Sequence, residues 1–328
     1  MGEVPLYRLY KWVPNWGLPS ISVACIEVEA YLRLGRIPVS AEDCTNSSTS
    51  PSGQLPALEH GLDLVEGVGD EFASARAITA YLRSHGSDLD AHLTMVQQAE
   101  LLAFAALVEA KLEPATLYTT WCEAESYSRH TRAAFAAGLP LPLNYWLPWN
   151  QRRAILRRFG GTSQAQVYEE AGKAYAALEE HLRSTSGKGS YFFGDKPSSL
   201  DAAIFAHIVF HHGAPVSAPE LRQKLSEHPA LVAYVERINR EVFSAPLPTA
   251  PPITSTAWAQ RAEESTTSPQ AQRERKELSS KDKEWRRGNQ MWLTAAGLAI
   301  AAYFLLSGQY IQFSTDFDFD EDDADDDE

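Results

Sequence analysis

Residues 196–210 read KPSSLDAAIFAHIVF, and this stretch carries most of the information about the fold. Ser198 is of a residue type favoured at the position that starts a helix. Asp201, three residues later, can accept a hydrogen bond from the backbone N–H of Ser198, which makes the aspartate form of a capping box. The run behind it is too apolar for a surface helix; it contains Leu200, Ala203, Ile204 and Ile208. The stretch predicts a capped helix at the centre of a helical domain.

The sequence on both sides of this helix is helical in character from residue 91 to residue 243. In residues 167–182, VYEEAGKAYAALEEHL, apolar side chains recur at the spacing of one helix face. They are Val167, Ala171, Ala174, Leu178 and Leu182. We therefore expect an all-helical domain over residues 91–243.

The preceding part of the chain, residues 3–86, mixes short β-like runs with helical patterns. Strands are predicted at 5–10, 36–40, 54–61 and 62–66, and helices at 21–34 and 74–86. A βαβ unit followed by a hairpin and a helix is the order of a thioredoxin-like domain.

A small α/β domain followed by a helical domain with a Ser-x-x-Asp cap resembles the glutathione transferases. The resemblance implies an α+β fold with a cis-proline before the third strand, where Pro56 stands. It also implies a hydroxyl or thiol at the start of the first helix, and an acid–serine pair after the fourth strand that holds the glutamyl group of glutathione. The chain offers Tyr7, Ser20, Ser22 and Cys25 at the first place, and we interpret Ser20 as a helix cap and Cys25 as a buried thiol. Ser74 and Ala75 replace the acid–serine pair. We predict that the site is lost, with no catalytic residue and no cofactor.

His207 and His211 lie one helical turn apart, a spacing that can place two imidazoles on one metal ion. The sequence offers no third ligand beside them. We therefore interpret the two histidines as polar residues on a packed helix, and predict no metal site.

Charge and cysteine content narrow the class of protein. The net charge is −14, but ten acidic side chains lie in the last thirteen residues, so the remainder carries only −4. The three cysteines lie far apart, which argues against a disulfide scaffold and fits a reducing compartment. The chain shows no basic surface interleaved with aromatics, so nucleic acid is not an expected partner. No N-terminal targeting segment is recognised, and a cytosolic start is expected.

Residues 291–313 are apolar enough to form a transmembrane helix about 34 Å long. Residues 244–287 before it are rich in Pro, Ser, Thr and charges, and are expected to be a linker. Four basic residues between 281 and 287 precede the span, and residues 314–328 after it are acidic, which places the body in the cytosol. The predicted anchor residues are Met291, Trp292, Leu293, Leu298, Ile300, Tyr303, Phe304, Leu305 and Leu306. A buried core helix is the alternative to this tail anchor.

Two aromatic segments are candidate interaction surfaces. Residues 12–22, WVPNWGLPSIS, occupy the loop between the first strand and the first helix, where relatives with thiol chemistry keep their active site. We interpret this loop as a rigid cap. Residues 138–159, GLPLPLNYWLPWNQRRAILRRF, form either a loop packed between helices or an exposed anchor for a partner or a membrane surface. The candidate surface residues are Trp12, Trp16, Tyr145, Trp146 and Trp149.

Three motifs together resemble the metaxins: WGLPS at 16–20, LPLPLNYWLPWNQRR at 139–153 and PSSLDAAIFAHI at 197–208. The tail anchor with an acidic end is most similar to the plant and algal members. The resemblance implies a glutathione-transferase-like subunit of the mitochondrial sorting and assembly machinery, which helps to insert β-barrel precursors into the outer membrane. It further implies as partners the barrel-forming core subunit, other metaxin-like subunits and the precursors themselves. The body would face the cytosol and the acidic tail the intermembrane space.

Two other functions remain open from the residues. One is a membrane-tethered glutathione transferase or peroxidase. The other is a tail-anchored adaptor at another organelle, because the anchor lacks basic residues directly after its span.

Overall fold

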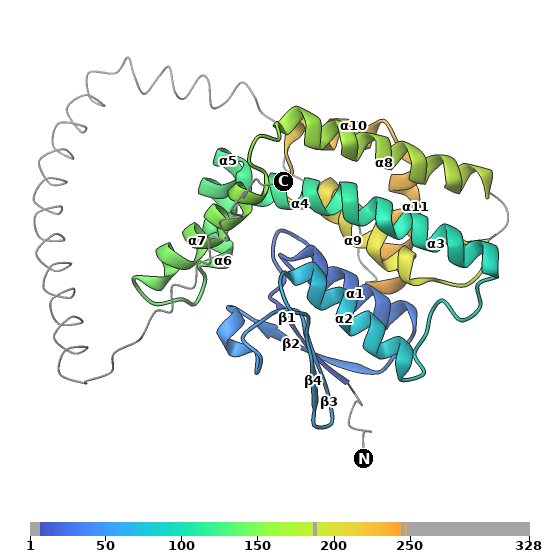
Figure 1. The fold of residues 1–328 in the computed structure, drawn as a ribbon, viewed down its shortest axis with the longest axis horizontal. Coiled ribbons are helices and arrows are strands. Elements are labelled where there is room, and N and C mark those ends of the chain that lie inside the picture. Colours follow the sequence, from blue (N-terminus) through green and yellow to red (C-terminus); the bar gives the residue numbers. More distant parts are fainter. Residues whose placement is uncertain (1–6, 186–188, 244–246, 248–328) are drawn as a thin grey trace, which may run out of the picture. The chain divides into compact units, whose positions relative to one another are not determined.

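The computed structural model describes residues 7–185, 189–243 and 247. Their first part forms a four-stranded sheet with two helices (Figure 1). The elements are β1 (Tyr7–Trp12), α1 (Val23–Leu34), β2 (Val39–Cys44), a single turn η1 (Ser47–Thr49), β3 (Ala57–His60), β4 (Asp63–Val65) and α2 (Glu71–Ser84). This is the predicted strand-helix-strand-strand-strand-helix order.

The sheet has the strand order β2-β1-β3-β4, in which β1 is parallel to β2 and antiparallel to β3. Side chains alternate along β1, so Tyr7 and Leu9 are buried while Arg8 between them is exposed. The inward face is covered by α1 and α2 (Figure 1). The opposite face is polar, because Arg8 approaches Glu59 at 3.6 Å and Tyr10 donates to the same carboxylate at 2.7 Å. The sheet therefore has one buried and one solvated face, as an antiparallel edge allows.

The peptide bond between Leu55 and Pro56 is cis, as the predicted cis-proline before β3 requires. Two other predicted boundaries are wrong. The strand expected at 36–40 begins at Val39 and continues to Cys44, because β2 pairs residue by residue with all of β1. The helix expected from residue 74 begins at Glu71, because the Asp70 side chain accepts the Ala73 N–H and caps it three residues earlier.

The second part of the described chain is helical. It comprises α3 (Met95–Leu107), η2 (Val108–Leu112), α4 (Glu113–Leu117), η3 (Tyr118–Cys122), α5 (Ala124–Ser126), η4 (Tyr127–Thr131), α6 (Arg132–Phe135), α7 (Leu143–Arg158), α8 (Gln164–Ser184), α9 (Ser199–Gly213), α10 (Pro219–Ser226) and α11 (Pro229–Val242). The elements η2, η3 and η4 are π-helical turns. Pro114, which lacks an N–H, lies two residues after the end of η2, and its ring disfavours the ordinary α-helical hydrogen bond back to residue 110.

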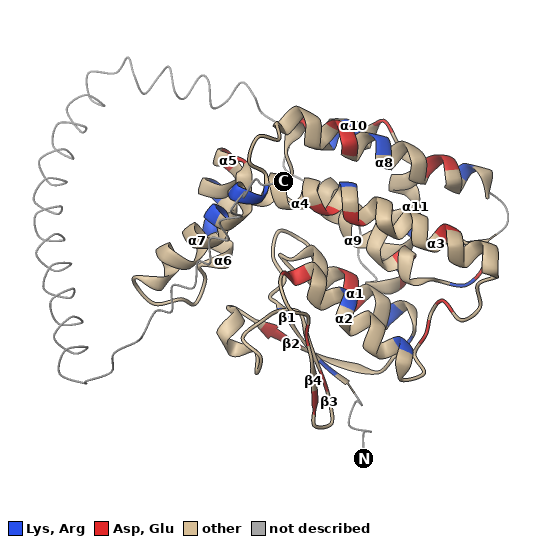
Figure 2. Cartoon of the chain, viewed as in Figure 1, with Lys and Arg blue, Asp and Glu red and all other residues tan. Residues whose placement is uncertain are grey.

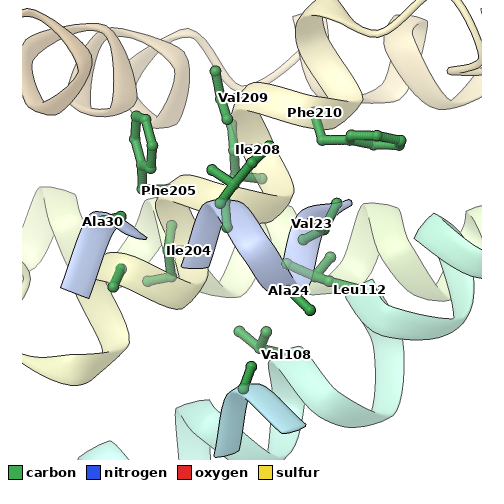
Figure 3. Packing of buried hydrophobic residues seen from close by; sticks show 14 of the residues in the cluster. Val23, Ala24, Ala30, Val108, Leu112, Ile204, Phe205, Ile208, Val209 and Phe210 are labelled. Atoms are coloured by element: carbon green, nitrogen blue, oxygen red, sulfur yellow. The ribbon is translucent and has the colours of Figure 1, made fainter. Parts of the chain in front are cut away.

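The two parts share one hydrophobic core, at the contact of α1 with α9 (Figure 3). Val23, Ala24 and Ala30 of α1, Ile204 and Ile208 of α9 and Leu112 of η2 all belong to this cluster (Figure 3). Nearly all of α9 is buried. This position explains why its sequence is apolar on every side rather than along one stripe.

The predicted cap of α9 is a buried hydrogen-bond centre. Asp201 is fully buried, and its Oδ2 accepts the Ser198 backbone N–H at 2.7 Å and the Ser198 hydroxyl at 2.5 Å. Its Oδ1 accepts the Phe192 N–H at 2.8 Å and the Tyr234 hydroxyl. The carboxylate therefore joins the start of α9 to the preceding loop and to α11.

The predicted linker (244–287), span (291–313) and acidic tail (314–328), including every predicted anchor residue from Met291 to Leu306, lie outside the described residues. Within the described residues, no helix combines the length and apolar character needed to cross a bilayer.

Candidate functional site

The start of α1 is where the transferase resemblance would place the hydroxyl that activates glutathione. The cap of α1 is Ser22, not Ser20 as the sequence suggested. Ser22 Oγ accepts the Cys25 N–H at 3.3 Å, whereas Ser20 Oγ accepts only the Ser22 N–H that precedes the helix. Both serines are buried. The hydroxyl of Ser22 donates to Glu71 Oε2 at 2.5 Å, so its only proton is already engaged within the protein.

Neither the Cys25 thiol nor the Glu71 carboxyl offers the chemistry of a transferase here. Cys25 is fully buried, and burial raises the pKa of its thiol to about 12. It is therefore a thiol rather than a nucleophilic thiolate at neutral pH. Burial also raises the pKa of Glu71 to about 7, against the opposing effect of the Ser22 hydroxyl. The Glu71 carboxyl joins the start of α1 to α2 through the hydrogen bond that it accepts from Ser22.

The position of the missing acid–serine pair lies inside α2. Ser74 is fully buried, its Oγ accepts the Gly67 N–H at 3.2 Å, and its own N–H donates to the Asp70 carbonyl at 3.2 Å. A carboxyl at this position would point into the protein, and the backbone N–H of residue 74 is not free to bind a ligand. Because α2 begins at Glu71, residue 74 lies within the first turn of the helix.

The loop between β1 and α1 is fixed by a buried lysine. Lys11 is 4% exposed, and its ammonium donates to the Pro19 carbonyl at 2.7 Å. It also contacts Asp43 Oδ1 at 3.0 Å and Glu29 Oε2 at 3.3 Å. Two carboxylates and a carbonyl around one ammonium compensate the cost of burying its charge. A cavity of about 410 Å³ lies beside this cluster and is bounded on its far side by Val209 of α9.

Trp12 and Trp16 in this loop contact the helical part of the same chain. Trp12 meets Phe135 of α6 edge to face, with ring centroids 5.0 Å apart. Trp16 meets Phe210 of α9 at 6.3 Å. Trp16 has φ of +57° and Gly17 has φ of +75°, as required by the tight turn that the Leu18 N–H closes on the Asn15 carbonyl. These two tryptophans are half-buried and cover a surface that belongs to their own chain.

His207 and His211 are buried in a chain of hydrogen bonds. Thr116 Oγ1 lies 2.8 Å from His207 Nδ1 and 2.8 Å from His211 Nε2, and Tyr175 Oη lies 2.8 Å from His211 Nδ1. Burial lowers the pKa of His211 to about 3 and that of His207 well below its usual range. The His207 ring is stacked on Phe72 of α2. In the described part of the chain, no group of three or more His, Cys, Asp or Glu side chains is arranged to hold a metal ion.

The aromatic residues of the second candidate segment are exposed on α7. Tyr145, Trp146 and Trp149 are 56%, 53% and 49% exposed, and Leu141 just before the helix is 75% exposed. These residues are therefore not a loop packed between helices, and their role as an anchor for a partner or a membrane surface stays a prediction. The sequence identified these aromatic residues but not the exposed leucines around them. Leucines at such spacings occur on buried helix faces as well as on exposed ones, so their pattern does not show that they are exposed.

Comparisons with known proteins agree with this fold. Residues 25–152 match the family model Tom37, described as an outer mitochondrial membrane transport complex protein, and residues 171–238 match a glutathione S-transferase C-terminal domain. Metaxin-1 of Bos taurus is 31% identical over 313 residues, which cover 92% of this chain and 90% of that protein. Metaxin-3 of Xenopus laevis is 30% identical over 249 residues, which cover 73% and 77%.

Among solved structures, a glutathione transferase from Phanerochaete chrysosporium is 14% identical and covers 73% of this chain and 97% of its own, with a TM-score of 0.49. The apo form of glutathione S-transferase III is 16% identical, with a TM-score of 0.44, and covers 76% and 100%. The particular likeness to plant and algal relatives stays a prediction. Because it is 31% identical to metaxin-1 of Bos taurus over 92% of its length, this chain belongs to the metaxin family.

Proposed function

We propose that this protein is a non-enzymatic subunit of a protein-transport complex in the mitochondrial outer membrane. The observation that carries the proposal is a transferase-like body whose glutathione position is closed by its own side chains, in a chain that belongs to the metaxin family. The match of residues 25–152 to an outer-membrane transport complex model supports the location and the general role.

The finer role proposed is in the sorting and assembly machinery. There the protein would assist the insertion of β-barrel precursors, together with the barrel-forming core subunit and other metaxin-like subunits. The predicted span at 291–313 would anchor it, with the body in the cytosol and the acidic tail in the intermembrane space. The support for the anchor and its orientation is the sequence alone.

The enzyme alternative is a membrane-tethered transferase or peroxidase, and a binding measurement separates it from the proposal. Glutathione is titrated calorimetrically into the full chain in detergent, with an authentic glutathione transferase measured in parallel. We expect no heat of binding at millimolar glutathione. The reason is that the Ser22 hydroxyl already donates its hydrogen bond to Glu71, and Ser74 is buried within α2. Micromolar affinity would refute the non-enzymatic assignment.

Membership of a complex is tested by purification from mitochondrial membranes. The tagged full chain, solubilised in mild detergent, is expected to bring down a β-barrel membrane subunit in a fixed ratio. A chain ending at residue 287 serves as the control, because it lacks the predicted span. If the full chain purifies without any barrel protein, the assembly role is wrong even where glutathione binding is absent.

The third function, an adaptor at another organelle, is tested by location. A fluorescent fusion that carries residues 273–328 is expected to reach mitochondria. Accumulation on the endoplasmic reticulum or on a plastid envelope would favour the adaptor.

A further inference from the structure

The buried side of helix α7, which packs against the body, is a narrow stripe. Pro148 and Ile155 are its buried residues. Arg152, between them, donates to the Trp121 carbonyl at 3.0 Å and to the Cys122 carbonyl at 3.3 Å, and lies over the Tyr127 ring at 4.4 Å. These contacts hold the orientation of α7 firmly. Most other side chains of the helix are exposed, although Arg158 contacts Asp70 at 3.1 Å and Arg132 of α6 lies over the Tyr145 ring at 5.3 Å.

The N-terminal end of α7 and the loop before it form an apolar tip. It is defined by the exposed side chains Pro140, Leu141, Pro142, Leu143, Tyr145, Trp146, Leu147 and Trp149. More than half of the exposed large hydrophobic residues in the described chain lie between Leu141 and Leu156. A contiguous apolar surface of this kind on a folded protein marks an interaction site. Two proline rings and the rigid mounting of α7 keep it in place without further ordering.

The C-terminal end of α7 is basic. Trp146, Trp149, Arg153 and Arg157 follow one another at intervals of three or four residues, so they lie on one face of the helix. That face is opposite the buried stripe of Pro148 and Ile155. In Figure 2 the ribbon of α7 is coloured for basic residues and nowhere for acidic ones. From residue 126 to residue 168 the sequence contains no Asp or Glu at all.

The order of side chains along α7, apolar and aromatic first and basic afterwards, matches the layers of an anionic bilayer interface. Tryptophan and tyrosine favour the boundary between hydrocarbon and headgroups, and arginine favours the phosphates above it. Arg153 lies over the Trp149 ring at 5.4 Å, which joins the aromatic and cationic parts into one unit. The chain beyond the described body leads, through the predicted linker at 244–287 of 44 residues, to the predicted span that begins at 291. Such a linker can extend to about 150 Å, so the span by itself would not orient the body.

We propose that the tip of α7 enters the headgroup region of an anionic lipid bilayer and fixes the orientation of the body on the membrane. Arg153 and Arg157 contact lipid phosphates, and Trp146 and Trp149 lie at the depth of the glycerol groups. This docking needs only a membrane and is independent of the transport role.

The test places an environment-sensitive dye on the tip of the full chain in vesicles. Leu143→Cys carries the dye, in a chain whose partly exposed Cys122 is changed to Ser. Leu62→Cys, at the fully exposed turn between β3 and β4, is the matched control. Each protein is reconstituted into neutral phosphatidylcholine vesicles and into vesicles containing 30% phosphatidylserine. Resistance to carbonate extraction tests the predicted anchor separately.

We expect the dye at residue 143 to shift to the blue in the anionic vesicles and to be quenched by brominated lipid, while the dye at residue 62 does neither. Changing both arginines, Arg153→Gln with Arg157→Gln, should lower the equilibrium constant for docking of the tip on the anionic vesicles about 25-fold. Each arginine near an anionic surface contributes about fivefold to that constant. Identical signals at residues 143 and 62 in anionic vesicles would overturn the proposal.

Two other occupants of the tip are separate outcomes of the same experiment. If the shift at residue 143 appears only when outer-membrane proteins are added, the tip docks on a protein and the lipid proposal is wrong. If it appears in neutral vesicles and is lost when residues 316–328 are deleted, the acidic tail occupies the tip, and the lipid proposal is equally refuted.

Discussion

The buried histidine pair gives the sharpest prediction of how this fold responds to acid. His207 and His211 are neutral in the folded protein because burial lowers both pKa values, that of His211 to about 3. In the unfolded chain each titrates near 6.5. A lowered folded pKa means that the unfolded state binds more protons below pH 6.5, so stability falls as the pH falls. Each histidine contributes a loss of about 2 kcal/mol between pH 6.5 and pH 5.0.

The perturbation is His207→Asn, which keeps a polar atom near the Thr116 hydroxyl and removes one titrating group. At pH 7.5 the variant should be less stable by about 2 kcal/mol, because the ring stacked on Phe72 is lost. By pH 5.0 this deficit should vanish, since the wild type has lost about the same amount through protonation of its unfolded state. Glu71 and Glu113, whose pKa values are raised to about 7 and about 8, act in the opposite direction but are present in both proteins.

The assay is urea unfolding of the full chain in detergent, followed by far-ultraviolet circular dichroism at pH 7.5, 6.5, 5.75 and 5.0. Phe72→Leu is the control, because it disturbs the same stack without removing a titrating group, and its deficit should be constant with pH. If the deficit of His207→Asn is also constant, then His207 is not buried in neutral form and the reasoning is refuted.

Three further substitutions test packing and capping by the same unfolding measurement. Asp201→Asn should cost about 4 kcal/mol, because an amide can accept on one side only where the carboxylate accepts on both; a loss below 1 kcal/mol would contradict the buried cap. Gly67→Ala should cost at least about 2 kcal/mol, since a Cβ there would lie 2.3 Å from the Ala73 carbonyl, and an unchanged stability would show that the loop can move. Trp16→Ala should cost about 2 kcal/mol through the lost contact with Phe210; no loss would mean that the loop does not cap the helical part.

The fold could be predicted because its signals are local. The Ser198–Asp201 cap, the apolar run behind it and the alternation along the strands each depend on residues close in sequence. The element order follows from them, and the cis bond at Pro56 agrees with the resemblance. The two boundaries that failed have different causes. The end of β2 at Cys44 depends on pairing with β1, a contact between distant residues. The start of α2 at Glu71 depends on the Asp70 cap, which is a local signal three residues from the N–H that it accepts.

The sequence by itself determined the family, the order of elements, the loss of the acid–serine pair and the two aromatic segments, because each is written in residue type and spacing. Only the tertiary structure decided where those segments lie. It directs the Ser22 hydroxyl to Glu71 as a hydrogen-bond donor and packs Trp12 and Trp16 against α6 and α9, while Trp146 and Trp149 are exposed. A tryptophan has the same local pattern in a core and on a surface. Which of the two it occupies depends on the elements that fold against it, and those come from distant parts of the chain.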